Sequence, residues 1–310
     1  MRVIDSHTAG EPTRVVIEGG PDLGEGSLAD KVRRLEQDHI DFFGAVVNEP
    51  RGHEAMVGAL LLPPSRPDCA AAVIYFNTLQ CLGMCGHATI GLAATLHHLG
   101  RIELGRHRIE TPVGIVEVHL ADANTASIVN VESYRLHKDI AVDVPGFGPV
   151  AGDVAWGGNW FFLMKDSPVP LELENVRALT DFTLTLRKAL EEAGVTGEVG
   201  AWIDHIELSG PAKNPSADSR NFVLCPGGAF DRSPCGTGSS AKLACLAGDG
   251  LLAPETDYVQ ESIIGSTYRL SYQKGEQGGV IPTITGQAFV TSEANLIFAP
   301  ADPYRSGFTA

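Results

Sequence analysis

Two related stretches of this chain, half a chain apart, decide its fold. The first reads Gly83-Met84-Cys85-Gly86-His87-Ala88-Thr89-Ile90-Gly91-Leu92, and the second reads Ser233-Pro234-Cys235-Gly236-Thr237-Gly238-Ser239-Ser240-Ala241-Lys242. When the two Cys-Gly pairs are superimposed, Ala94 coincides with Ala244, Leu96 with Leu246, and Gly100 with Gly250. A second match follows between the segments 110–114 and 261–265. Such self-similarity indicates a divergent duplication in which each half forms one structural unit.

Each copy places a cysteine where an α-helix begins and a glycine where that helix ends. Glycine just beyond the last helical residue is a common C-terminal signal, and it accounts for Gly100 after His97-His98. Strand-like segments flank both helices. The pattern therefore predicts a mixed α/β (α+β) fold with two pseudo-symmetric domains, each a strand-rich half around a central helix that starts at a cysteine.

The proline- and glycine-rich stretch Val144-Pro145-Gly146-Phe147-Gly148-Pro149 is the best candidate for a boundary. We therefore expect an N-terminal half over residues 1–145, a C-terminal half over 146–294, and an active site between them. A last strand over 295–310 is expected to cross back to the first half. Locally, Ser27 and Asp30 predict a capping box at a helix start, and residues 45–47 are expected to form a strand.

Composition excludes several classes of function. The chain has 310 residues, with 38 acidic against 23 basic side chains and a net charge of −15, which argues against nucleic acid or an anionic membrane as partner. No targeting segment is visible, and the apolar runs are too short to span a bilayer. The six cysteines are expected to be thiols in a cytoplasmic protein. No zinc site, no phosphate-binding glycine loop and hence no cofactor are expected.

Two thiols at helix starts suggest a particular chemistry. Backbone N–H groups at a helix N-terminus bind carboxylates, and the same field is expected to lower the pKa of Cys85 and Cys235. Two such starts could hold one carboxylate and place a thiol on either face of its α-carbon. One thiolate would then remove the α-proton while the opposite thiol delivers another. A hydrolase with one nucleophilic cysteine and His87 as its base, and a non-catalytic amino-acid binding protein, remain alternatives.

The chain resembles the proline racemase family, within the diaminopimelate epimerase-like group of cofactor-independent racemases, and among them the 4-hydroxyproline 2-epimerases most closely. The motifs that carry the resemblance are spread over most of the chain, and the two cysteine motifs are the specific ones. They are Asp5-Ser6-His7-Thr8-Ala9-Gly10-Glu11-Pro12-Thr13-Arg14, Glu49-Pro50-Arg51-Gly52, Met84-Cys85-Gly86-His87, Trp156-Gly157-Gly158-Asn159-Trp160-Phe161, Asp204-His205-Ile206-Glu207 and Asp231-Arg232-Ser233-Pro234-Cys235-Gly236-Thr237-Gly238.

The resemblance implies epimerisation at the α-carbon of 4-hydroxyproline, from trans-4-hydroxy-L-proline to cis-4-hydroxy-D-proline, without cofactor or metal. It implies that Cys85 and Cys235 are the acid/base pair. The backbone of Gly86, His87, Gly236 and Thr237 would bind the carboxylate, and Asp231, His87 and His205 would contact the amine. Asp231 could instead cap the turn before Cys235, and His205 could be an ordinary strand residue.

The substrate within this family stays open between 4-hydroxyproline and proline, and the sequence leaves a homodimer open. The chain departs from the family pattern at Ala88 and at Leu79-Gln80-Cys81, which neighbour Cys85. Relatives that dehydrate trans-3-hydroxyproline carry threonine at the position of Cys235, so the resemblance disfavours that activity.

Overall fold

The computed structural model describes residues 1–308 and divides the chain into two compact units, Met1–Ile128 with Gly286–Ala310, and Val129–Thr285. These boundaries differ from the predicted ones at 145/146 and near 295. The reason is that β9 (Tyr134–Val144) and β10 (Gly148–Trp156) pair in one antiparallel hairpin. The segment between them is the tight turn of that hairpin, with positive φ at Gly146 and Gly148, rather than a linker.

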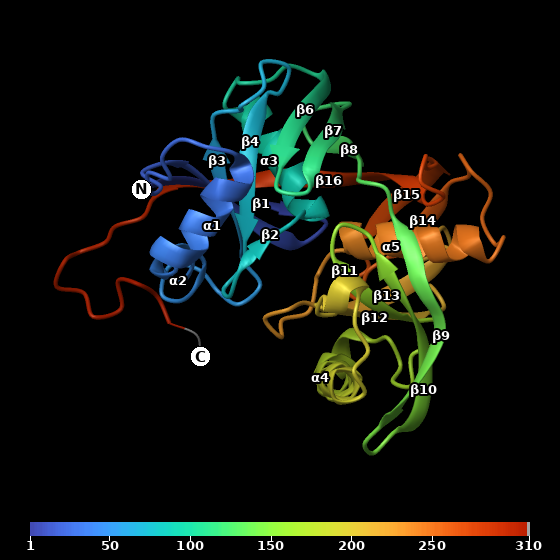
Figure 1. Cartoon of the computed structure of the whole chain (residues 1–310). Helices are drawn as coiled ribbons and strands as arrows, with labels where there is room; N and C mark the ends of the chain where they lie inside the picture. The colour runs from blue at the N-terminus through green and yellow to red at the C-terminus, as the bar shows by residue number, and fades with distance from the viewer. Residues whose placement is uncertain (309–310) are drawn as a thin grey trace. The chain divides into compact units, whose positions relative to one another are not determined.

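The first unit is a sheet whose two edge strands meet. Its strands follow the order β1-β2-β3-β4-β6-β7-β8-β16, and β16 also pairs with β1 from Arg2↔Asn295 to Thr8↔Ala288 (Figure 1). The strands therefore form a closed ring without a free edge. Their bounds are β1 (Arg2–Thr8), β2 (Glu11–Glu18), β3 (Val57–Leu62), β4 (Ala71–Phe76), β6 (Gly105–Thr111), β7 (Gly114–Leu120), β8 (Thr125–Val129) and β16 (Val280–Asn295), with the short β5 (Cys81–Leu82) beside β4.

The second unit repeats this scheme. Its strand order is β9-β10-β11-β12-β13-β14-β15-β16, and a bridge between Ser133 and Val280 joins the two ends. From β10 to β15 the ladders alternate antiparallel, parallel, antiparallel, parallel and antiparallel, as they do from β1 to β7. The additional strands are β11 (Trp160–Met164), β12 (His205–Gly210), β13 (Ser219–Leu224), β14 (Tyr258–Glu261) and β15 (Thr267–Lys274). Strand β14 was not predicted from the sequence.

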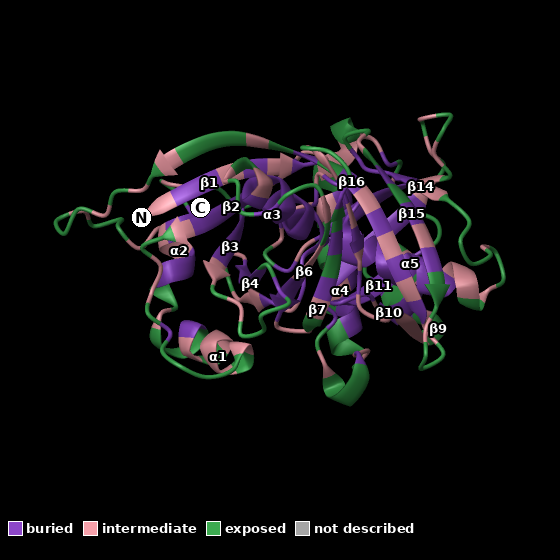
Figure 2. Ribbon diagram, turned by 90° about the horizontal axis from the view of Figure 1, so that it is seen from above, coloured by how far each residue is buried: buried purple, intermediate pink, exposed green. Residues whose placement is uncertain are grey.

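One helix lies inside each unit. Helix α3 (Gly86–His98) contacts β1, β2, β3 and β7, and helix α5 (Gly236–Gly248) contacts β9, β10, β11 and β15. Both are buried on every face over most of their length (Figure 2), because small and apolar side chains occupy all sides. Both also end alike, with Arg101 N–H donating to Leu96 O at 2.8 Å and Leu251 N–H donating to Leu246 O at 2.9 Å.

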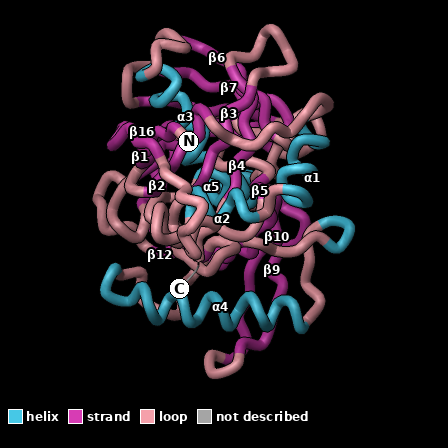
Figure 3. The backbone as a smooth tube through the Cα atoms, turned by 90° about the vertical axis from the view of Figure 1, so that its left-hand side faces the viewer, coloured by secondary structure: helices cyan, strands magenta, loops and turns pink. Residues whose placement is uncertain are grey.

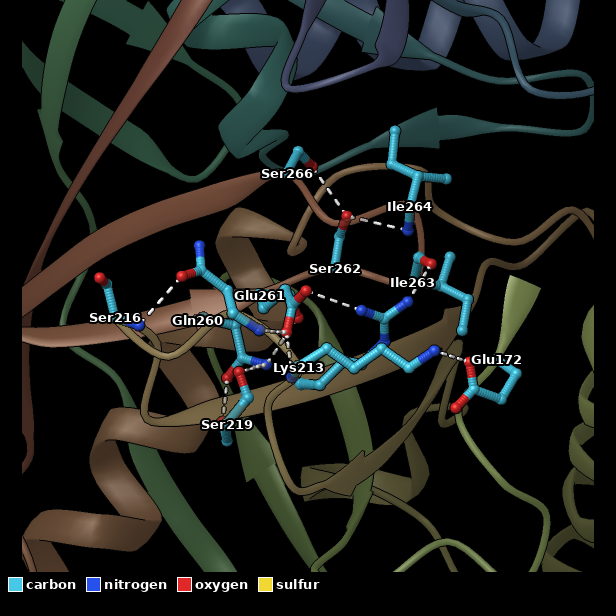
Figure 4. A network of polar contacts seen from close by, with 12 residues as sticks. Glu172, Lys213, Ser216, Ser219, Gln260, Glu261, Ser262, Ile263, Ile264 and Ser266 are labelled. Atoms are coloured by element: carbon cyan, nitrogen blue, oxygen red, sulfur yellow. Dashed lines mark hydrogen bonds and ion pairs between the residues drawn. The ribbon is translucent and has the colours of Figure 1, made fainter.

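The duplicated segments 110–114 and 261–265 have the same structural role. Glu110 and Glu261 each accept backbone N–H groups from the loop that precedes a neighbouring strand. Figure 4 shows the surroundings of Glu261. The donors to Glu110 are Ser65 N and Oγ (both 3.0 Å) and Arg66 N (2.8 Å); those to Glu261 are Lys213 N (2.7 Å), Asn214 N (3.1 Å) and Arg220 Nη1 (2.7 Å).

The remaining helices lie outside the strand rings. Helix α1 (Leu28–Asp38) begins with the predicted capping box of Ser27 and Asp30, which is confirmed. The strand predicted at 45–47 is wrong: these residues end helix α2 (Asp41–Val47), since Phe42, Phe43, Val46 and Val47 form one buried helical face. Helix α4 (Val176–Glu192) is amphipathic and packs on β9 and β13. Figure 3 shows it as the long helix at the bottom of the view. Short 3₁₀ turns occupy Leu173–Asn175 and Glu198–Gly200. Within residues 1–308, no helix has the length and apolar character needed to cross a membrane.

Candidate active site

In the first unit, Cys85 is the residue that precedes helix α3. Its backbone is extended, with φ −140° and ψ 111°, and its Sγ lies 3.4 Å from His87 Nδ1. Both side chains are buried. Thr8 Oγ1 donates to the carbonyl of His87 at 2.8 Å, and Thr89 Oγ1 donates to the carbonyl of Cys85 at 2.7 Å. These bonds fix the first turn of α3, where helical N–H groups have no intrahelical acceptor and are suited to bind an anion.

In the second unit, Cys235 precedes helix α5 but has a different backbone. Its φ is +62° and its ψ is 104°, a backbone conformation that residues other than glycine rarely adopt. Its Sγ lies 3.8 Å from Thr237 Oγ1, which in turn accepts from Asn159 Nδ2 at 3.3 Å. The motif around Gly157 packs directly on this turn, because a Cβ at Gly157 would lie 2.1 Å from the Thr237 carbonyl. The structure therefore brings Gly236, Thr237 and the Trp156–Phe161 motif together.

Asp231 lies in the loop that leads to Cys235 and is 4 % exposed. Its Oδ1 accepts the N–H of Ser233 at 2.8 Å, and the Oγ of Ser233 accepts the N–H of Cys235 at 3.1 Å. The turn-capping contact considered for Asp231 is thus present. A contact between Asp231 and a substrate amine stays a prediction.

His205 lies at the start of β12, in the same unit as Cys235. Its Nδ1 is 2.6 Å from Asp204 Oδ1, and its ring stacks on Phe161 with centroids 4.6 Å apart. Phe161 and Cys235 belong to one apolar cluster. The carboxylate of Asp204 holds the imidazole in one orientation, as a partner on one ring nitrogen does in many functional histidines.

Glu207 and Lys242 were not identified from the sequence as site residues. Their side chains form a buried ion pair, with Lys242 Nζ 2.7 Å from Glu207 Oε1, and Lys242 also donates to Gln260 Oε1 at 2.8 Å. Glu207 touches the helix start, since a Cβ at Gly238 would lie 2.5 Å from Glu207 Oε2 and 3.2 Å from Cys235 Sγ. Glu207 lies within a motif quoted above, but only the three-dimensional structure brings it to Lys242.

The protonation of Cys235 differs from the expectation. Burial raises the pKa of the Cys235 thiol well above its ordinary value, and the nearby Asp231, Cys225 and Glu207 add to the effect. A hydrogen bond from the backbone of Gly238 acts in the opposite direction. The predicted lowering of the pKa is therefore wrong for Cys235, because desolvation and neighbouring carboxylates outweigh the helix field.

Each unit thus contributes its own set of candidate residues: Cys85, Gly86 and His87 in the first, and His205, Asp231, Cys235, Gly236 and Thr237 in the second. None of the six cysteines, all of which lie in the described part of the chain, forms a disulfide. Among residues 1–308, no three His, Cys, Asp or Glu side chains cluster in a way that could hold a metal ion.

Comparison with known proteins identifies the lineage. The proline racemase family model matches residues 3–309, nearly the whole chain. The chain belongs to the proline racemase family. Curated relatives in this family include the 4-hydroxyproline 2-epimerase of Roseibium alexandrii, which is 75% identical over 99% of this chain and 94% of its own length. The 4-hydroxyproline 2-epimerase of Xanthomonas campestris is 56% identical over 99% of this chain and 98% of its own.

Solved structures agree with the family. A hydroxyproline epimerase from Agrobacterium vitis, with bound trans-4-hydroxy-L-proline, superimposes with a TM-score of 0.90 at 26% identity, covering 100% of this chain and 95% of that one. A PhzF-family phenazine biosynthesis protein from Bacillus anthracis shares the fold alone, with a TM-score of 0.64 at 15% identity over 95% of this chain and 98% of its own. The predicted mixed α/β fold of this racemase group is confirmed by these matches.

Proposed function

We propose that this chain is a 4-hydroxyproline 2-epimerase that inverts the α-carbon of 4-hydroxyproline. The observation that carries the proposal is the 75% identity, over nearly the full length of both chains, with a relative of that name. The duplicated cysteines at two helix starts give the proposal a chemical basis. That none of the six cysteines forms a disulfide in the described structure fits a cytoplasmic enzyme.

In this proposal the helix starts bind the substrate carboxylate. The backbone N–H groups of Gly86, His87, Gly236 and Thr237 would donate to it, and the negative charge that develops on the carboxylate during proton removal would be stabilised by the same groups. Asp231, with His87 and His205, would receive the protonated ring amine. Asp231 is suited to this role because its carboxyl group is buried, where a charge-assisted hydrogen bond to an ammonium group is strong.

The proposed proton steps start from Cys235, because burial raises the pKa of its thiol and so favours the protonated form. It would therefore act first as the acid, while Cys85, beside His87 at 3.4 Å, acts as the base. The α-C–H bond breaks and its proton passes to Cys85, while the S–H bond of Cys235 breaks and its proton reaches the α-carbon from the other face. The epimer reacts with the two roles exchanged.

Proline is the second candidate substrate, because the chain also superimposes with a TM-score of 0.91 on a probable proline racemase from Agrobacterium radiobacter. The chemistry would be the same, and the two substrates differ only in the hydroxyl at C4. We assign 4-hydroxyproline because two curated relatives that are 75% and 74% identical carry that name, while the probable racemase is 26% identical.

The test is incubation of the purified enzyme with each isomer of 4-hydroxyproline and of proline in heavy water. We expect one deuterium on the α-carbon of the inverted product, and a higher kcat/KM for 4-hydroxyproline than for proline. Chiral chromatography gives the stereochemistry, and NMR gives the deuterium content. Binding without exchange of the α-proton would contradict the proposal and indicate a binding protein, while a trapped acyl-thioester would indicate a hydrolase. Faster turnover of proline would reassign the substrate.

A further inference from the structure

The peptide group between Pro234 and Cys235 is held at both ends by buried side chains. Its carbonyl accepts from Asn221 Nδ2 at 2.8 Å and from Ser239 Oγ at 3.2 Å. Its N–H donates to Ser233 Oγ at 3.1 Å. Asn221, Ser233 and Ser239 are each at most 1 % exposed, so these bonds form away from water, where leaving a polar group unpaired is costly.

This peptide group precedes a strained residue. Cys235 has φ +62° and ψ 104°. Residues with a β-carbon rarely adopt a positive φ, so this backbone conformation is strained. Pro234 adds to the constraint, because its ring fixes its own φ. With the peptide group fixed on one side and α5 beginning on the other, the backbone of Cys235 cannot relax by rotation of this peptide.

The equivalent position in the duplicated half has a different backbone and a different hydrogen bond. Cys85 has an ordinary extended backbone with φ −140°. Thr89, which corresponds to Ser239 in the repeat, donates to the carbonyl of Cys85 itself at 2.7 Å, one peptide further along the chain. The strain is therefore specific to the second cysteine and is not a general property of the repeated motif.

We propose that Ser233, Asn221 and Ser239 form a clamp on the Pro234–Cys235 peptide that holds Cys235 in its strained conformation and thereby aims its Sγ. The three are positioning residues, since their bonds go to the main chain and they act through Cys235. The inference rests on the proposed function for its catalytic consequence. A thiol that delivers a proton to one face of a carbon must be placed accurately, because a displacement of the reacting group by about 1 Å can lower the rate about a hundredfold.

The first arm of the test is kinetic. Ser233→Ala should lower kcat about tenfold or more with KM changed less than about threefold, because the proton transfer is misaligned while the carboxylate still binds. Ser233→Thr keeps the hydroxyl and should restore kcat to within about threefold of wild type. The matched control is Ser262→Ala: Ser262 is also buried, and its Oγ also accepts an N–H two residues on, from Ile264 at 3.3 Å (Figure 4). It should leave kcat within about twofold.

The second arm does not depend on activity. In protein labelled with ¹³C-cysteine, the Cα and Cβ shifts report the backbone angles of each cysteine, and the Cys235→Ser variant assigns the signals of Cys235. Ser233→Ala should move the Cys235 signals toward values for negative φ and leave those of Cys85 in place. If Ser233→Ala does not fold, Ser239→Ala serves instead, because alanine suits a helix interior.

The two arms separate the two proposals. A wild-type enzyme without epimerase activity, combined with shifted Cys235 signals in the variant, would refute the function and keep the clamp. Unchanged Cys235 signals in the clamp variants would overturn the clamp, whatever the activity. An equal loss of kcat in Ser262→Ala would overturn it as well, since the effect would then reflect the loss of any buried hydroxyl.

Discussion

Replacing Lys242 by methionine would leave the carboxylate of Glu207 buried beside the start of α5 without its counter-ion. Glu207 has no exposed surface, and its two oxygens accept no hydrogen bond within the described part of the chain, so the ammonium at 2.7 Å is their main compensation. Gln260 keeps a second donor, the hydroxyl of Ser219 at 2.8 Å. Removing one partner of a buried pair typically costs about 3–5 kcal/mol of stability.

The double variant Glu207→Gln/Lys242→Met separates the loss of the counter-ion from the loss of the lysine side chain, because it removes both charges together. We therefore expect Lys242→Met to lose about 3–5 kcal/mol of unfolding free energy and the double variant to lose much less.

The measurement is urea denaturation of wild type, Lys242→Met and the double variant at pH 7. The double variant should lie within about 1.5 kcal/mol of wild type, as neutral replacements of buried pairs often do. An equal loss of stability in the single and the double variant would refute the reasoning, because it would mean that the carboxylate of Glu207 does not depend on its counter-ion.

Four further outcomes are expected. Cys85→Ser and Cys235→Ser should each retain less than about a tenth of wild-type epimerisation, a barrier increase above about 1.4 kcal/mol, in a chiral assay; a nearly silent substitution at either position would exclude a two-thiol mechanism. Asp231→Asn should lower kcat/KM about tenfold or more, as for a lost charge-assisted bond of about 1.5–3 kcal/mol, and unchanged kinetics would leave Asp231 with its capping role alone. Because burial raises the pKa of Cys235 above the ordinary 9.0, alkylation of Cys235 by iodoacetamide, followed by peptide mass spectrometry, should still be rising with pH at that value, and a plateau below it would be inconsistent with the burial. Gly238→Ala should lose activity despite a better helix former, since its Cβ would lie 2.5 Å from Glu207 Oε2; wild-type kinetics would show that the carboxylate can move aside.

The features that the sequence predicted are those encoded in local patterns. The capping box at Ser27 and the two buried helices after Cys85 and Cys235 depend on neighbouring residues and on the repeat. The strand at 45–47 was wrongly predicted because Val46 and Val47 are β-branched and favour strands. In the structure they share one buried face of a helix with Phe42 and Phe43. Local propensity was outweighed there by burial of one face.

Features that depend on distant residues were not predictable in the same way. The state of Cys235 depends on burial and on Glu207, whose position follows from the pairing of β12 with its neighbours. The bond from Asn221 to the Pro234 carbonyl joins residues of one loop-strand connection that only folding brings together. A sequence pattern identifies which residue types are present, but it does not show how deeply a thiol is buried.

The late position of β16 in the chain has a consequence for synthesis on the ribosome. The ring of the first unit is completed by residues 288–295, which pair with β1, while all strands of the second unit are complete by residue 285. The half that emerges first therefore has an unpaired edge strand, β1, until almost the whole chain has been translated. The half that emerges second can finish its sheet earlier. This reverses the usual order in which the N-terminal domain folds first, and it leaves the nascent first half exposed to strand pairing with other chains for most of translation.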